Sequence, residues 1–112
     1  MGNFDFESGL RYMAEGELDE AIRCFLSSLD LDPRSVPTYI ALLGAYEHAW
    51  HELGDPGVLE QMRRVAVAGL KRDPDPEQRR LLQEGLDRAD EGLVALGESE
   101  ELLTIRRGPA GG

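Results

Sequence analysis

The sequence has a single cysteine and no long apolar run. Because Cys24 stands alone, an internal disulfide is impossible and a zinc site built from cysteines is excluded, so we expect Cys24 to be a small packing residue on a helix. No stretch approaches the roughly 20 apolar residues of a membrane-spanning helix. The opening MGNFDFESG contains two acids and no basic residue, unlike a secretory leader. We therefore expect a soluble protein of the cytoplasm.

Positive charge is also scarce, and it is unevenly distributed. The formal net charge is −10; residues 1–62 hold twelve acidic and three basic residues, whereas residues 63–112 hold ten acidic and nine basic ones. A surface this acidic repels phosphate groups, so we expect neither nucleic acid nor an anionic membrane as a partner. A basic or apolar protein partner is compatible with this charge.

Strand patterns are nearly absent, since no alternating run of β-branched residues is longer than LLTI at residues 102–105. Helix signals are strong, and they predict five helices joined by short loops, over residues 3–14, 17–32, 35–53, 55–72 and 75–96. A hydrophobic fraction of 41% is enough for one folded core in a chain of 112 residues. The sequence therefore predicts an all-α protein made of two antiparallel hairpins and a closing helix.

Side chains that can cap a helix stand at the predicted helix starts. We expect Asn3, Ser35 and Asp55 to be N-caps, because their side-chain oxygens can accept from the first free backbone N–H groups. Asp75 and Gln78 are three residues apart, the spacing of a capping box. We expect the last helix to end at Gly97 and to be followed by a short turn around residues 100–105.

Small and aromatic residues recur at fixed spacings between Gly9 and Pro33, as Gly9-x2-Tyr12 and Ala21-x3-Phe25. This pattern resembles the tetratricopeptide repeat, a helix–turn–helix unit of 34 residues. Each position has a physical reason. Gly9 and Ala21 are small where two helices approach closely, and the two aromatic side chains fill the space between those helices.

A second unit follows the same pattern less closely. Its first helix places Tyr39, Leu42 and Tyr46 at the aromatic, leucine and tyrosine positions, although Leu43 stands where glycine is usual. The next Asp-Pro pair ends at Pro74, 41 residues after Pro33 instead of 34. Seven extra residues are close to two helical turns, so we expect a longer second hairpin.

The resemblance implies a short α-solenoid of helical hairpins. We expect one domain over residues 1–97, made of repeat one (3–34), an extended repeat two (35–74) and a capping helix (75–97), with residues 98–112 as a partly flexible tail. The capping helix carries an apolar stripe at Leu82, Leu86, Ala89, Leu93 and Leu96. Two units and a cap are fewer than the usual three repeats, which leaves a homodimer open.

Tetratricopeptide hairpins expose the first helix of each unit on a concave groove. By position, the resemblance implies a peptide-binding groove formed by Phe6, Leu10, Met13, Ile40, Gly44, Glu47, His48 and His51. We expect this groove to bind a helical or extended apolar segment of a protein partner, as an adaptor without catalysis or a cofactor. A dedicated chaperone that shields an apolar segment of one client is the alternative. The cap, the tail or a second copy could also cover these residues.

Three further features have a functional and a structural interpretation. His48 and His51 are spaced to hold a metal on one helix face, which leaves a metal-handling role as an alternative, although no third ligand is evident. Trp50 is expected to anchor the extended hairpin, or else to be an interface residue. The basic pairs at 63–64, 71–72 and 79–80 are expected to pair with neighbouring acids, or to contact the acidic half of another copy.

Overall fold

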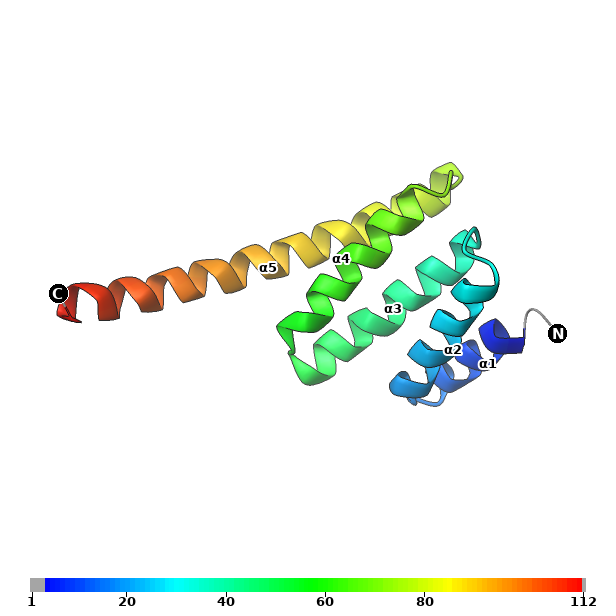
Figure 1. The fold of residues 1–112 in the computed structure, drawn as a ribbon, viewed down its shortest axis with the longest axis horizontal. Helices are drawn as coiled ribbons and strands as arrows, with labels where there is room; N and C mark the ends of the chain where they lie inside the picture. The colour runs from blue at the N-terminus through cyan, green and yellow to red at the C-terminus, as the bar shows by residue number, and fades with distance from the viewer. Residues whose placement is uncertain (1–3, 112) are drawn as a thin grey trace.

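The computed structural model describes the backbone of residues 4–111 and the side chains of residues 5–97. Within that backbone range all regular structure is helical, with no strand (Figure 1). The five helices are α1 (Phe4–Ala14), α2 (Leu18–Leu31), α3 (Val36–Leu53), α4 (Pro56–Leu70) and α5 (Pro76–Gly111). The predicted all-α class and the number of helices are confirmed for these residues. None of the helices searched in the described part has the length and apolar character to cross a bilayer.

Two of the predicted caps form as expected. The Asp55 carboxylate accepts a hydrogen bond from the Gly57 backbone N–H at 2.9 Å. At the start of α5, the Gln78 backbone N–H donates to Asp75 Oδ1 at 2.8 Å, and the Asp75 backbone N–H donates to Gln78 Oε1 at 2.9 Å. This reciprocal pair is the predicted capping box.

The expected side-chain cap at Ser35 is wrong. Ser35 does occupy the N-cap position of α3, but its hydroxyl forms a 2.8 Å hydrogen bond with the Thr38 hydroxyl and none with a backbone N–H. A nearby hydroxyl that can both donate and accept competes for the serine oxygen. The cap expected at Asn3 lies outside the described residues.

The predicted end of the last helix is also wrong. α5 continues past Gly97 and through the expected turn at 100–105, and its far part extends beyond the rest of the molecule (Figure 1). A glycine ends a helix when it adopts the left-handed conformation, as Gly54 does at the end of α3 with φ 65°. Gly97 is not among the glycines with positive φ. A glycine in the right-handed helical conformation makes the helix about 1 kcal/mol less stable than an alanine would, but it does not end the helix.

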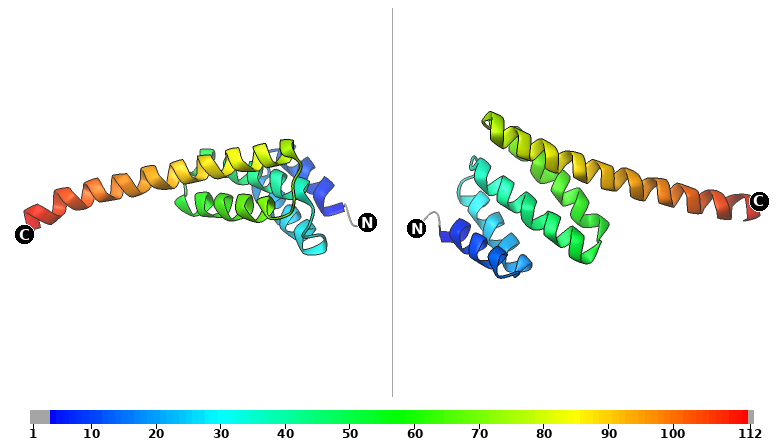
Figure 2. Two further views of the ribbon diagram at one scale, coloured as in Figure 1. Left: turned by 90° about the horizontal axis from the view of Figure 1, so that it is seen from above. Right: turned by 180° about the vertical axis from the view of Figure 1, so that it is seen from behind.

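The helices pack in chain order, each against the next. α3 is the central element because it also contacts α1 and α5, whereas α2 and α4, among the described helices, do not contact each other. Figure 2 shows the same arrangement from two further sides, with the long helix α5 along one face of α3 and α4. α3 therefore joins the first hairpin to the last two helices.

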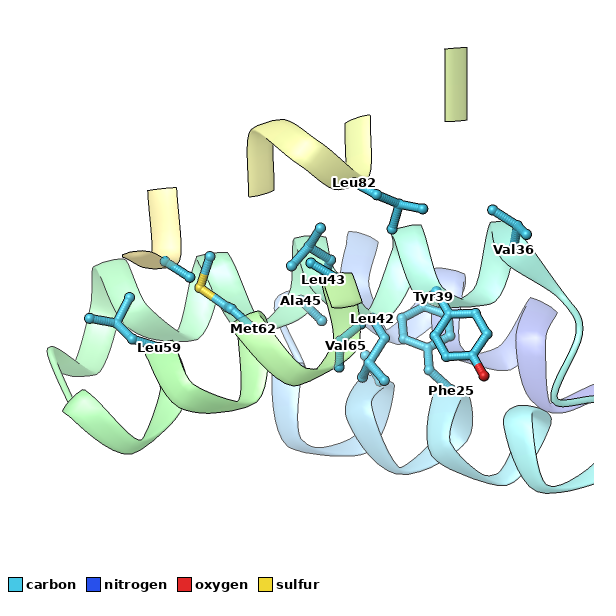
Figure 3. Packing of buried hydrophobic residues seen from close by; sticks show 13 residues of the cluster. Phe25, Val36, Tyr39, Leu42, Leu43, Ala45, Leu59, Met62, Val65 and Leu82 are labelled. Atoms are coloured by element: carbon cyan, nitrogen blue, oxygen red, sulfur yellow. The ribbon is translucent and has the colours of Figure 1, made fainter. Parts of the chain in front are cut away.

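The core follows this order as one continuous cluster. Phe25 of α2, Leu42 of α3, Leu59 and Met62 of α4, and Leu82 of α5 are all fully buried (Figure 3). The hydrophobic contact therefore runs from the first hairpin to the last helix. Within the predicted stripe of α5, Leu82 and Ala89 are buried, and the other three leucines are partly buried against the core.

Close helix approach depends on small residues, as predicted for the first hairpin. A Cβ atom added at Gly9 would lie only 2.5 Å from Phe25 Cε1, so the phenylalanine ring occupies the space that any side chain there would need. The sequence pattern did not indicate that α5 uses the same device. Added Cβ atoms at Gly85 and Gly92 would collide with Leu43 of α3 and with Leu59 of α4.

Two glycines of α5 provide a matched test of this packing. Gly85→Ala should lower the free energy of unfolding by about 1–3 kcal/mol, because the added methyl group meets Leu43 in a filled core. Gly97→Ala should raise it by up to about 1 kcal/mol, because among the described residues nothing lies within 4 Å of the new Cβ and alanine favours the helix. Urea unfolding followed by circular dichroism measures both. Equal effects of the two substitutions would contradict the packing described.

Candidate functional site

A cleft of about 400 Å³ lies where α1 meets the end of α2 and the start of α3. We call it the N-terminal cleft. It contains two of the predicted groove residues, Phe6 and Leu10. The three helices and the loop between α2 and α3 contribute its lining residues, which are Phe6, Glu7, Leu10, Ser28, Asp32, Ser35, Pro37 and Thr38.

The apolar part of the N-terminal cleft is both exposed and well supported. Leu10 is 44% exposed, and unlike Leu26, which is exposed to the same extent, it lines a cleft together with Phe6 and Pro37. Phe6 packs against the core, with its ring centroid 5.9 Å from that of the buried Phe25. Pro37, in the first turn of α3, lines the cleft from a third helix and is also exposed. The cleft therefore offers apolar surface on a rigid base.

The polar part of the N-terminal cleft is acidic. Glu7 and Asp32 are both exposed, and no lysine, arginine or histidine is among the lining residues. Asp32 Oδ1 accepts a hydrogen bond from the Arg34 backbone N–H at 3.2 Å. Within the described side chains neither carboxylate forms an ion pair. Among the described side chains, their negative charge is therefore not balanced by a cationic group in direct contact.

Three of the predicted groove residues join helices and are less available to a ligand. A Cβ atom added at Gly44 would lie 3.3 Å from Met13 Cε, so the Met13 side chain of α1 reaches α3 at the point where α3 has no side chain. Ile40 and Met13 are both partly buried against the core. These residues hold α1 to α3 beside the N-terminal cleft.

A second cleft, of about 300 Å³, lies between α3, α4 and α5, and we call it the tryptophan cleft. It contains the predicted residues Glu47 and His51 together with Trp50, which is partly buried against the core as expected of a packing anchor. Arg88 of α5 forms an ion pair with Glu47 across this cleft, with Nη2 donating to Oε1 at 3.2 Å. The charge of Glu47 is therefore balanced within the chain.

The two histidines lie on the surface of α3. His48 and His51 are both exposed. Among the residues that the structure describes, no three His, Cys, Asp or Glu side chains gather in a way that could hold a metal ion. The third ligand that a metal site at His48 and His51 would need is not found in that part of the chain.

The basic pairs behave partly as expected. Arg63 Nε donates to Asp90 Oδ1 at 3.0 Å, and Arg80 pairs with Glu77 and with Glu84, so pairing with neighbouring acids is confirmed for these two arginines. The hydrogen bond and the charge of Arg80 lower the pKa of Glu77 below its ordinary value. Arg64, Lys71 and Arg72 line a shallow depression of about 440 Å³ on α4, and none of them pairs with an acid among the described side chains.

Cys24 is a half-buried residue of α2. Burial raises the pKa of its thiol above the ordinary value, and the negative charges of Asp5 and Glu20 raise it further. Both effects disfavour the thiolate, which is the reactive form of cysteine. The position therefore suits packing better than nucleophilic chemistry.

No family model, curated protein or solved structure matches the chain. The function must therefore be argued from the geometry and charge of the chain itself.

The reactivity of Cys24 tests its surroundings. Alkylation by iodoacetamide, followed by mass spectrometry from pH 7 to 10.5, should give a higher apparent thiol pKa in the folded protein than in urea. Asp5→Asn should lower the folded value slightly, because burial is the larger cause and remains. A folded pKa equal to or below the value in urea would contradict this account.

Proposed function

We propose that this chain is a non-catalytic protein-interaction module that binds an apolar segment of a partner in the N-terminal cleft. The observation that carries the proposal is the exposure of Leu10 in a cleft lined by three helices. Exposed apolar surface that is concave and rimmed by polar groups usually marks a binding site. A volume of about 400 Å³ suits a few side chains of a short segment better than the surface of a whole domain.

The proposed scaffold is a short tetratricopeptide-like solenoid. Three observations support it in addition to the sequence resemblance. Gly9 faces Phe25, as the repeat pattern expects of a close helix pair. α3 contacts both α1 and α5, whereas α2 and α4 stay apart, as they do when the first helices of successive hairpins line the inner side of a curve. The Tyr39 hydroxyl donates to the Pro33 carbonyl at 2.8 Å and ties the second hairpin to the end of the first.

Binding would be driven by removing Leu10 and its neighbours from water. Full burial of a leucine side chain contributes about 1.5–3 kcal/mol, so covering a residue that is 44% exposed supplies a fraction of that value. Phe6 adds surface that is already held in place by Phe25. A cleft built on three packed helices loses little conformational freedom when it binds, which keeps the entropic cost on the side of the partner.

The chain provides a matched pair of variants for testing this proposal. Leu10 of α1 and Leu26 of α2 are both 44% exposed, but only Leu10 lines the N-terminal cleft. Affinity capture from a lysate of the source cells should retain the same partner with the native chain and with Leu26→Glu. Leu10→Glu should weaken that retention at least tenfold, because a carboxylate would have to be buried against an apolar segment.

The controls decide how the result is understood. Ile40→Glu is unsuitable because Ile40 packs against the core, whereas both chosen leucines reach solvent and should leave the helical content and the melting temperature nearly unchanged. If Leu10→Glu retains the partner as well as Leu26→Glu does, the N-terminal cleft is not the binding surface. A partner that is soluble only when it is co-expressed with this chain would assign the narrower chaperone role.

A further inference from the structure

The chemistry of the N-terminal cleft says more about its partner than that the partner is apolar. We propose that the bound segment is basic, with a lysine or arginine next to its apolar anchor; this inference rests on the proposed function. The cleft places two carboxylates, those of Glu7 and Asp32, at the edge of the apolar surface formed by Phe6, Leu10 and Pro37. A partner segment with one apolar and one cationic side chain matches both parts.

The two carboxylates are available to a ligand. Both residues are exposed, no cationic side chain lines the cleft, and within the described side chains neither carboxylate forms an ion pair. An acidic segment would bring like charges together, and a neutral one would leave both carboxylates partly desolvated without a partner. A basic segment gives them charge-assisted hydrogen bonds as its apolar anchor is buried.

The wider charge distribution favours the same partner. Residues 5–38, which form α1, α2 and the start of α3, carry eight acidic and three basic residues, so the elements around the cleft are negative as well. At physiological salt the Debye length is about 8 Å, and the rim carboxylates therefore dominate the bound state. The more distant acids chiefly increase the rate at which a basic segment arrives, and this effect weakens as salt is added.

Three other concave surfaces in the described part of the chain have different charge. The one on α5 is lined by Arg79, Arg80, Glu84 and Asp87 and combines both signs. In the tryptophan cleft, Glu47 is paired with Arg88, so one of its two acidic lining residues is balanced within the chain and Glu91 is the other. The depression on α4 is lined by Arg64, Lys71 and Arg72 and carries the opposite sign. The N-terminal cleft combines exposed apolar groups with two acidic residues and has no cationic side chain in its lining.

A second copy of the chain is a weaker candidate for the occupant. Its basic α4 surface has the right sign, but the apolar residues between the cations are Val67 and Ala68, which are short and partly buried. They offer no large side chain to cover Leu10. A separate segment with a leucine, isoleucine, methionine or phenylalanine beside a lysine or arginine fits the cleft better.

A peptide selection tests the proposal without knowledge of the natural partner. A displayed library of random 12-residue peptides is selected on the full chain, and peptides that also bind Leu10→Glu are removed. The remaining, Leu10-dependent peptides should be enriched in lysine or arginine next to a large apolar residue. A fluorescent copy of the most enriched peptide should bind more weakly as NaCl is raised from 50 to 300 mM.

Paired charge variants then locate the effect. Glu7→Gln combined with Asp32→Asn should weaken binding of that peptide roughly threefold to tenfold, since each exposed ion pair contributes little by itself. Asn at position 32 keeps the oxygen that accepts from the Arg34 backbone N–H, which preserves the local turn. Glu15→Gln combined with Asp19→Asn removes the same charge outside the cleft lining and should change the affinity less than twofold.

The outcomes separate this inference from the function on which it rests. Leu10-dependent peptides that are apolar without basic enrichment would overturn the inference and leave the proposed function standing. The absence of any Leu10-dependent peptide would overturn both. If the two double variants weaken binding equally, the peptide responds only to the overall negative charge of the chain. That result would contradict a direct contact with Glu7 and Asp32. Salt-sensitive self-association that Leu10→Glu abolishes would make a second copy the occupant and would also overturn the inference.

Discussion

Close packing of small residues against large ones positions every helix of this chain. Phe25 fills the space that a side chain at Gly9 would need, and this contact sets α1 against α2. Gly85 and Gly92 let α5 approach Leu43 and Leu59 in the same way. Because an added methyl group in a filled core must displace its neighbours, these contacts specify the helix spacing far more sharply than the leucine stripe alone. Phe25 also supports Phe6, which lines the N-terminal cleft.

α3 converts these pairwise contacts into one body. It packs between the first hairpin and the last two helices, and it contacts α1 through Met13 and Gly44 and α5 through Leu43 and Gly85. The N-terminal cleft lies at the start of α3 and the tryptophan cleft near its end. The same helix thus supports an acidic cleft whose Glu7 and Asp32 form no ion pair among the described side chains, and a second cleft in which Glu47 is paired with Arg88 of α5.

Local chemistry explains how much of this the sequence could predict. The capping box of Asp75 and Gln78 involves neighbours in the chain, and its prediction was correct. The expected stop at Gly97 was wrong, because a glycine ends a helix only if the backbone turns left-handed there, and composition does not decide that. Phe6 and Leu10 were assigned to a groove by position in the repeat pattern. Asp32 and Pro37 were missed, since Asp32 reaches the cleft from the loop after α2 and Pro37 from α3, and neither has a spacing that links it to Leu10.

The central claim is that the surface around Leu10 is open in the free chain and is covered when a ligand binds. Cysteine labelling tests it most directly, with Pro37→Cys inside the cleft and Leu26→Cys outside it, each placed in a Cys24→Ser background that keeps Leu10. The account predicts rapid alkylation of both thiols in the free protein, and selective slowing at position 37 when a selected basic peptide is added. A thiol at position 37 that is already protected in the free protein would contradict the account, and so would a peptide that slows both positions equally or neither.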